Sequence, residues 1–268
     1  MNTEVTRIYK GPRGWRLATS GGEVDAHQIV VAIGNQRIAH IPQWPGDNEF
    51  TGEMLHSSEY RSPGSYQGKR VLVVGAGSSG MEIAHDLATG GADKVWLGIR
   101  APPNILLRSL PGGLPGDLVS LPLFRAPVRI ADAISRAARR ANLGDLAEFG
   151  LPIPPEGTFT RVKHHDQVPA LVDMDVIDAF RDGSIEVVAT VESFDGDNVV
   201  LVDGSRLDPH AIVLATGYRR GLEPLVGHLG VLDARGKPVV WGERPAADGL
   251  RFIGYDIRPS RPSPSVRP

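Results

Sequence analysis

The sequence predicts an α/β fold built around a parallel sheet, and two observations carry that prediction. First, the apolar run Arg70–Val74 leads into a glycine-rich turn, a helical segment and a second apolar run, Lys94–Ile99. Second, two segments far apart in the chain each end in a continuous apolar run instead of an alternating one. Continuous apolar runs are typical of strands buried on both faces, which occur in parallel sheets.

The composition is that of an ordinary globular protein and excludes several classes of function. The 268 residues are 41% hydrophobic and carry a formal net charge of −2, so no basic surface for nucleic acid is expected. Cysteine is absent, which excludes disulfides, thiolate zinc sites and a thiol nucleophile. No apolar run approaches the ~20 residues that cross a bilayer. The first fourteen residues lack the apolar segment of a signal peptide. We therefore expect a cytoplasmic protein with no membrane partner.

The first apolar run and its successors predict a strand–helix–strand unit. Residues Arg70–Val74 form the first strand, the helix covers about Ser79–Thr89, and Gly90 and Gly91 end it. The second strand is Lys94–Ile99. Two strands joined by a helix pair in parallel through a right-handed crossover.

The turn between this strand and helix has the GxGxxG pattern of dinucleotide-binding sites. Its residues are Gly75, Ala76, Gly77, Ser78, Ser79 and Gly80. The first glycine permits a tight turn, the second lets a pyrophosphate approach the backbone, and the third allows close helix–strand packing. The helix N-terminus supplies unpaired N–H groups. We predict a Rossmann-like dinucleotide-binding domain; a glycine-rich turn without a ligand is the alternative.

An arginine follows the second strand of this unit. An NAD site places Asp or Glu there to accept the ribose 2′-hydroxyl, whereas this chain has Arg100. A guanidinium pairs with a 2′-phosphate, which favours NADP(H). The alternative is an ordinary exposed arginine.

The chain also contains an internal repeat. Gly21–Gly34 aligns without gaps on Gly204–Gly217, and seven of the fourteen pairs are identical. Each copy predicts antiparallel strands of a β-meander followed by a buried strand that ends in glycine. Half identity without a gap argues against the alternative, that any two hairpin-plus-strand segments look alike.

The remaining segments carry weaker signals. Residues 102–127 predict a long loop, Val128–Asn142 a helix, and residues 150–160 a proline-rich connection. The helix is expected to bury its apolar side chains and to leave its arginines in solvent. His164 and His165 are adjacent in an extended segment, so their side chains point to opposite faces and no metal site is predicted.

A further motif precedes the dinucleotide unit. The pattern FxGxxxHxxxY is formed by Phe50, Gly52, His56 and Tyr60. It resembles the signature of the class B flavoprotein monooxygenases, and its final tyrosine is similar to the flavin-containing monooxygenase branch. The turn that ends in Gly34 resembles the family's first ATG motif.

A second turn supports the same resemblance. Thr216 and Gly217 lie in a segment that resembles the second ATG motif of the family, and residues 68–86 are most similar to auxin-type members. The resemblance implies NADPH and FAD as cofactors and oxygenation of a small organic substrate through a flavin hydroperoxide. It also implies that His56 and Tyr60 set domain geometry, and it identifies no catalytic residue.

These observations predict four parts of the chain. Residues 1–67 are expected to be a remnant of a FAD-type Rossmann domain with a linker, and 68–208 the NADPH-binding domain. Residues 209–257 return to the FAD-type remnant. Residues 258–268 contain only Arg, Pro, Ser and one Val, which predicts a disordered tail.

The family has two GxGxxG turns, whereas this sequence has one. Two hypotheses follow. The chain is an NADPH-dependent flavin monooxygenase-type oxidoreductase whose FAD turn is not in the sequence, or it is a non-catalytic NADP-binding fragment or one half of a split enzyme. The split enzyme requires a separate FAD-domain chain as partner.

We expect the purified chain alone to be colourless and unable to oxidise NADPH. The reason is that FAD would lack the backbone donors and helix N-terminus of a second phosphate turn. Visible absorbance and NADPH consumption test this, and a separately expressed FAD-domain chain restores both if the enzyme is split. A yellow preparation with stoichiometric FAD from this chain alone would contradict the prediction.

Overall fold

The structure is a computed structural model that describes residues 2–12, 14–110 and 112–255. Two compact units are present. Unit 1 comprises Met1–Ala39 with Tyr218–Pro268, and unit 2 comprises His40–Gly217. The expected disordered tail lies outside the described residues.

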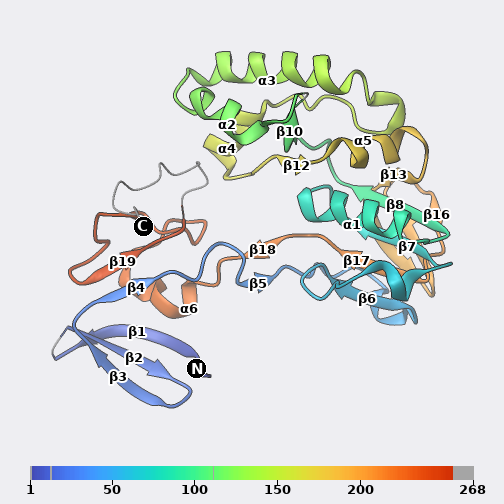
Figure 1. Cartoon of the computed structure of the whole chain (residues 1–268). Helices are drawn as coiled ribbons and strands as arrows, with labels where there is room; N and C mark the ends of the chain where they lie inside the picture. Colours follow the sequence, from blue (N-terminus) through green and yellow to red (C-terminus); the bar gives the residue numbers. More distant parts are fainter. Residues whose placement is uncertain (1, 13, 111, 256–268) are drawn as a thin grey trace. The chain divides into compact units, whose positions relative to one another are not determined.

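Unit 2 is organised by a five-stranded sheet in which every neighbouring pair is parallel. In spatial order the strands are β13 (Ile185–Ala189), β8 (Lys94–Ile99), β7 (Arg70–Val74), β17 (Ala211–Leu214) and β6 (Glu53–His56). Helix α1 (Ser78–Thr89) connects β7 to β8 and packs on both (Figure 1). The predicted strand–helix–strand unit and the α/β fold class are confirmed.

The sheet of unit 2 is covered on both faces, which explains its continuous apolar strands. On one face, Val71, Val73 and Leu97 pack with Met81 and Leu87 of α1. The other face is covered by an antiparallel meander of β14 (Val191–Asp195), β15 (Asn198–Leu201) and β16 (Arg206–Leu207). All four residues of β17 are buried, as expected for a strand between two apolar layers.

Unit 1 contains the other copy of the repeat. A meander of β1 (Val5–Gly11), β2 (Gly14–Thr19) and β3 (Gly22–Ala26) precedes β4 (Ile29–Val31), which pairs in parallel with β19 (Leu250–Phe252). The remaining regular elements of unit 1 are β5 (Ile38–Ala39), β18 (Tyr218–Arg219), α6 (Glu223–Val226) and a 3₁₀ turn at Gly227–Leu229.

The expectation that the first repeat strand is buried on both faces is wrong. Ile29 and Val31 are buried at 7% and 5% exposure, but Val30 between them is 53% exposed. The cause is that one face of β4 packs into the core of unit 1, and the other face is open to solvent.

The boundaries of the two units differ from the sequence-based division. Unit 2 begins at His40, so it includes the FxGxxxHxxxY segment that the sequence assigns to 1–67. It also includes β17, which the sequence assigns to 209–257. The reason is strand pairing, since β6 and β17 lie side by side in the sheet that contains β7.

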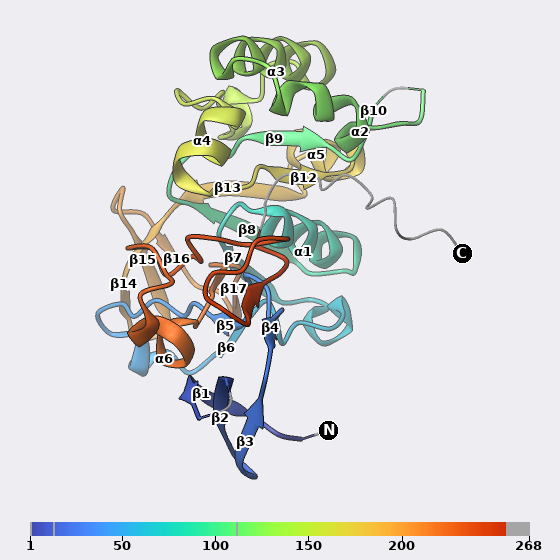
Figure 2. The same cartoon turned by 90° about the vertical axis from the view of Figure 1, so that its left-hand side faces the viewer.

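Residues 102–127 are not the long loop that their composition predicts. They include β9 (Ile105–Leu107), which pairs in parallel with β12 (Ala170–Val172). A hairpin of β10 (Ser109–Leu110) and β11 (Leu114–Pro115) and helix α2 (Gly116–Ser120) follow. The other helices of unit 2 are α3 (Val128–Leu143), α4 (Thr158–His165) and α5 (Met174–Arg181), with 3₁₀ turns at Asp47–Glu49, Pro63–Tyr66, Leu121–Phe124 and Ala147–Phe149. In Figure 2, β9 and β12 lie between α1 and α3.

The buried face of α3 is mixed and differs in part from the sequence-based expectation. Ala131 is buried and three of the four arginines are exposed, as expected, but polar side chains are buried as well and two isoleucines are exposed. Asp132 and Arg139 are 8% and 7% exposed, whereas Ile130 and Ile134 are 53% and 47% exposed. The buried face meets backbone N–H and C=O groups of α4 and the preceding proline-rich segment, so polar side chains fit better there than aliphatic ones. Among the described residues, no helix has the length and apolarity needed to cross a membrane.

Asp132 caps the N-terminus of α4 from the neighbouring helix. Its carboxylate accepts the N–H groups of Phe159 (2.7 Å) and Thr160 (3.3 Å) and the hydroxyl of Thr160 (2.5 Å). We expect Asp132→Ala to lower the free energy of unfolding by about 1–2 kcal/mol, as measured by urea denaturation.

The control for this substitution is Asp145→Ala. Asp145 also accepts a backbone N–H, that of Ala147, but it is exposed, so its loss should cost less than about 0.5 kcal/mol. Equal stabilities of the two variants would contradict the capping role.

Candidate dinucleotide site

The candidate site lies at the carboxyl edge of the parallel sheet of unit 2. Strands β7, β8, β17 and β6 run in the same direction, so the residues that follow them meet at one edge. These residues include the glycine-rich turn, Arg100, Thr216 and Gly217, and the second half of the signature motif, which runs from His56 at the end of β6 to Tyr60. Ligands of open α/β sheets bind at this edge.

The first and third glycines of the turn are required by close packing. Gly75 has φ = 115°, and a side chain there would collide with the carbonyl of Ala215. Its N–H donates to the carbonyl of Gly98 (2.9 Å) on the neighbouring strand. A side chain at Gly80 would collide with the carbonyl of Gly75. The N-terminal end of α1 therefore lies directly against the end of β7.

The second glycine faces open space. Gly77 has φ = −79°, a conformation that any residue adopts, and a Cβ atom there would have no heavy atom within 4 Å. Nothing in the fold of the described residues therefore demands glycine at this position. The space beside it is open to a ligand.

The first turn of α1 is suited to an anion. The helix begins at Ser78, and no side chain caps its N-terminus at Gly77. The first N–H groups of a helix have no acceptor within it and carry partial positive charge. Ser79 is exposed, whereas the Ser78 hydroxyl accepts the N–H of Leu171 (2.9 Å) and so joins α1 to β12. The backbone cradle beside Gly77 fits a pyrophosphate.

Arg100 follows the last residue of β8 and is exposed. Among the described residues, its side chain has no hydrogen-bond or ion-pair partner. Its guanidinium is therefore available to an anionic ligand at the carboxyl edge of the sheet.

His56 is a buried structural histidine at the end of β6. It is 1% exposed, and its Nε2 lies 3.0 Å from the carbonyl of Gly217. A carbonyl only accepts, so Nε2 carries a proton, and Nδ1 accepts the N–H of Ser58 (3.2 Å). Both ring nitrogens are occupied, and the ring connects β6 to the turn after β17.

Thr216 and Gly217 are held by a second segment as well. The carbonyl of Gly217 also accepts the N–H of His40 (2.9 Å), and the hydroxyl of Thr216 donates to the carbonyl of His40. The turn is thus fixed by backbone and side-chain bonds. The repeat-related Gly34 lies in unit 1, in the left-handed conformation with φ = 73°.

The other three signature residues also have defined contacts in unit 2. The Tyr60 hydroxyl donates to Asp86 of α1 (2.6 Å), and burial together with this bond raises the pKa of Tyr60. Phe50 packs edge-on against Phe194, with ring centroids 5.7 Å apart. A Cβ on Gly52 would lie 2.7 Å from the carbonyl of His210, so this position requires glycine.

Sequence reasoning missed the partners of these residues. Asp86 and His40 carry no local signal, because they lie in an ordinary helix and an ordinary linker. Their roles depend on Tyr60 and Thr216, which are distant in the sequence.

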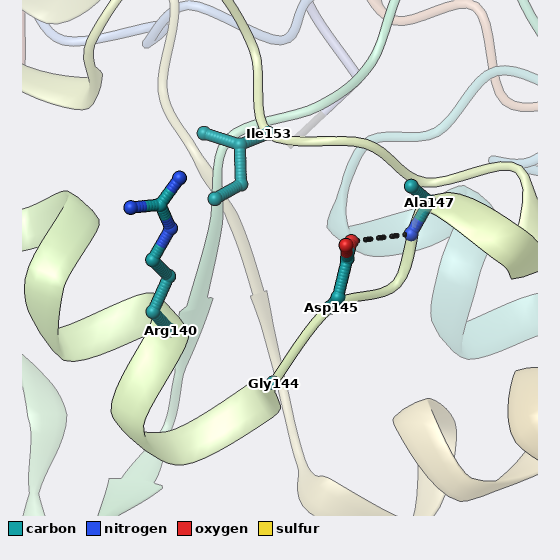
Figure 3. Close-up of a pocket in the computed structure, with 5 residues that line it drawn as sticks. All are labelled: Arg140, Gly144, Asp145, Ala147 and Ile153. Carbon is teal, nitrogen blue, oxygen red and sulfur yellow. Dashed lines mark hydrogen bonds between the residues drawn. The ribbon is translucent and has the colours of Figure 1, made fainter.

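Two hollows in the structure do not coincide with the candidate site. One of about 470 Å³ is lined by Arg140, Gly144, Asp145, Ala147 and Ile153 near the end of α3 (Figure 3). A second of about 360 Å³ shares two of these residues. The carboxylate in the first already accepts a backbone N–H, and neither hollow includes a residue of the turn. We assign no site to them.

The prediction that His164 and His165 lie in an extended segment is wrong, because both lie in the last turn of α4. His165 Nε2 lies 2.9 Å from Glu156 Oε1. Within the described ranges, no group of three or more histidine and acidic side chains is placed to hold a metal ion.

The flavin-binding monooxygenase-like family model matches residues 19–225, which is more than half of the chain. The chain belongs to this family. The family that the sequence predicts is thereby confirmed. The parallel sheet of unit 2 agrees with the predicted Rossmann-like fold.

The proteins similar in sequence to this chain agree with the predicted resemblance to the auxin-type branch of the family. The indole-3-pyruvate monooxygenase YUCCA1 of Oryza sativa subsp. japonica is 35% identical over 252 residues, which are 91% of this chain and 61% of that protein. YUCCA8 of Oryza sativa subsp. indica is 32% identical over 272 residues, 95% of this chain and 64% of the relative. The chain spans less than two thirds of the length of these relatives.

Solved flavin monooxygenases share the fold. The flavin-containing monooxygenase from Stenotrophomonas maltophilia matches with a TM-score of 0.62 and 21% identity, covering 94% of this chain and 62% of that one. An oxidized steroid monooxygenase bound to NADP matches with a TM-score of 0.67 and 23% identity, covering 83% and 54%.

The different surroundings of two glycines give a paired test. We expect Gly77→Val to keep its free energy of unfolding within about 0.5 kcal/mol but to abolish NADPH binding, because its side chain fills the space for the pyrophosphate. We expect Gly80→Ala to be destabilised, because its Cβ meets the Gly75 carbonyl.

Urea denaturation and calorimetric titration with NADPH measure the two effects. Retained NADPH binding by folded Gly77→Val would show that the turn has only a structural role.

Proposed function

We propose that this chain binds NADPH and acts in an FAD-dependent monooxygenase that oxygenates a small organic molecule. The observation that carries the proposal is the open space beside Gly77 at the uncapped N-terminus of α1. A backbone site with no side chain in it and several unpaired N–H groups around it has the chemistry of a pyrophosphate site.

In this proposal, different groups of unit 2 bind different parts of NADPH. The N–H groups at the start of α1 would hold the pyrophosphate, and Arg100 would pair with the ribose 2′-phosphate. The open space beside Gly77 admits the ligand to the backbone. When bound, the cofactors supply hydride transfer from the nicotinamide and activation of dioxygen by the reduced flavin.

The signature residues have a positioning role in this proposal. His56 connects β6 to Gly217, and Tyr60 connects the same segment to Asp86 of α1. Both bonds attach the segment before β7 to elements that border the nucleotide turn. Because both ring nitrogens of His56 are engaged, it orients the backbone of the site and does not serve as a proton acceptor.

The substrate class is proposed from the relatives. Those named above are indole-3-pyruvate monooxygenases, which supports a small 2-oxo acid as the molecule oxygenated. A cytoplasmic location and a separate FAD-domain polypeptide as partner are parts of the same proposal.

A second function is NADP binding without catalysis. It is favoured by one observation, that the whole nucleotide turn and its supporting contacts lie within unit 2. This function predicts NADPH binding that leads to no NADPH oxidation when FAD and a FAD-domain partner are supplied. NADPH oxidation under those conditions supports the monooxygenase function.

Arg100→Ala tests the cofactor preference. A charge-assisted contact is worth about 1.5–3 kcal/mol, so we expect about a 10- to 100-fold loss of NADPH affinity. NADH lacks the 2′-phosphate, so its affinity should change little. Calorimetric titration of both nucleotides measures the difference.

The control is Arg129→Ala, which removes an equal charge from the exposed surface of α3. Equal affinities of the wild-type chain for NADPH and NADH, unchanged by Arg100→Ala, would refute the phosphate contact.

A further inference from the structure

Arg139 of α3 is a buried cation that has no carboxylate partner among the described residues. It is 7% exposed, and its guanidinium donates to the carbonyls of Pro103 (3.0 Å), Leu151 (2.8 Å) and Pro152 (3.2 Å). Its Nε has no hydrogen-bond acceptor among the described residues, and burial lowers the pKa of this arginine. Burying an arginine against neutral carbonyls is costly. A second arginine, on α4, also donates to a proline carbonyl. The two arginines together indicate which segment of backbone Arg139 holds in place.

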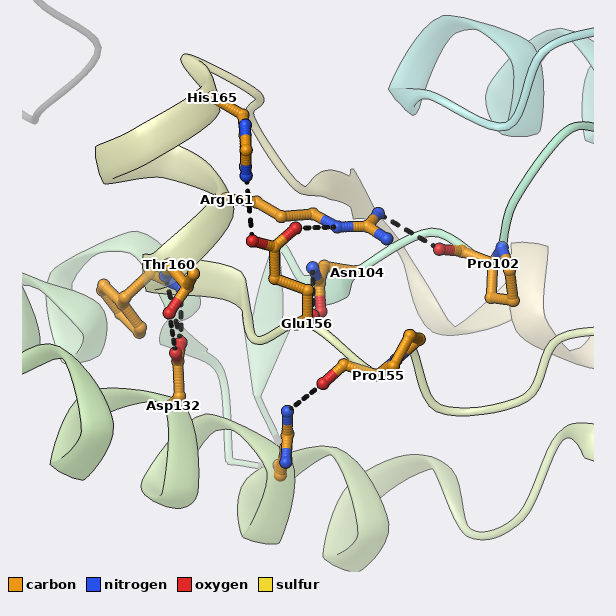
Figure 4. Close-up of polar contacts among 10 residues, drawn as sticks. Pro102, Asn104, Asp132, Pro155, Glu156, Thr160, Arg161 and His165 are labelled. Atoms are coloured by element: carbon orange, nitrogen blue, oxygen red, sulfur yellow. Dashed lines mark hydrogen bonds and ion pairs between the residues drawn. The ribbon is translucent and has the colours of Figure 1, made fainter.

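Arg161 of α4 reaches the neighbouring carbonyl. Its Nη1 donates to the carbonyl of Pro102 (3.2 Å), and its Nε lies 3.5 Å from the carboxylate of Glu156. Figure 4 shows Arg161 extending from α4 between Glu156 and Pro102. Glu156 also accepts the Asn104 amide at its backbone carbonyl (3.3 Å).

Three successive carbonyls are therefore held. The carbonyls of Pro102 and Pro103 accept from Arg161 and Arg139, and that of Asn104 accepts the N–H of Ala170 in β12 (2.8 Å). Proline has no N–H, so the carbonyl is the main-chain group through which each proline can be held. Side chains of two helices and the backbone of one strand fix residues 102–104.

Residues 102–104 follow closely after Arg100 in the chain. Only one residue separates Arg100 from Pro102, and the Arg100 side chain has no described partner of its own. Its backbone position therefore depends on β8 on one side and on the held carbonyls on the other. A cation held in place before its ligand arrives loses less conformational entropy on binding.

We propose that Arg139 and Arg161 are positioning residues for the 2′-phosphate of NADPH. They hold the carbonyls after Arg100 so that its guanidinium is placed at the carboxyl edge of the sheet. The inference rests on the proposed function, in which Arg100 contacts that phosphate. Neither residue touches the nucleotide in this proposal.

The test uses Arg139→Met and Arg161→Met in the full chain. Methionine keeps much of the apolar stem and removes the bonds to the prolines. Calorimetric titration gives the ratio of NADPH to NADH affinity for each variant. We expect the ratio to fall about 5- to 10-fold, with NADH affinity nearly unchanged, because the loss concerns the 2′-phosphate alone.

The matched control is Arg136→Met. Arg136 also donates from α3 to a proline carbonyl, that of Pro155 (2.6 Å), but this carbonyl is not in the segment after Arg100. The ratio of NADPH to NADH affinity of Arg136→Met should equal that of the wild-type chain. A purely structural role for Arg139 and Arg161 would lower stability and affect both nucleotides equally.

A double variant isolates the route of the effect. Arg161→Met should add no further loss of preference to Arg100→Ala, because it acts through Arg100. Arg161 is less buried than Arg139, so Arg161→Met decides the matter if Arg139→Met fails to fold. Preference lost in Arg100→Ala but retained in Arg161→Met overturns this inference alone. Preference retained in Arg100→Ala overturns the proposed phosphate contact.

Discussion

The candidate site depends on the close approach of three stretches of backbone at the end of β7. Gly75 lies against the carbonyl of Ala215, and Gly80 lies against the carbonyl of Gly75, with no room for a side chain at either position. This packing places the first turn of α1 directly over the carboxyl edge of the sheet. The uncapped N–H groups and the open space beside Gly77 are consequences of that placement.

The second copy of the internal repeat also fixes this carboxyl edge of the sheet. Because β17 lies between β7 and β6, its final turn borders both the nucleotide turn and the signature segment. The carbonyl of Gly217 accepts from His56 and from His40, and Tyr60 adds a bond to α1. His56 and Tyr60 of the family motif thus fix the position of backbone around the glycine-rich turn.

The helices after β8 follow a different principle. Helix α3 turns two charged side chains inward, where Asp132 caps α4 and Arg139 donates to carbonyls of the proline-rich segments. Proline-rich segments offer few N–H groups and many carbonyls. Buried cationic donors satisfy those carbonyls, whereas aliphatic side chains would leave them without partners. Ile130 and Ile134 lie on the other side of α3 and are exposed to solvent.

The sequence by itself determined the parallel sheet, α1 and the glycine-rich turn, because local patterns encode them. Four apolar residues before Gly75 and a stop at Gly90 define a strand, a turn and a helix without reference to distant contacts. The repeat likewise indicated two meanders, each followed by a strand in parallel pairing.

Only the tertiary structure decided which faces are buried and which partners meet. The exposure of Val30, the inward side of α3 and the bonds of His56 and Tyr60 depend on residues far away in the sequence. The periodicity of a sequence indicates that a helix has an apolar face and a polar face. The chemistry of the surface against which the helix packs decides which of the two faces is buried. At α3 part of that surface is backbone, so Asp132 and Arg139 are buried on the same face as Ala131 and Leu143.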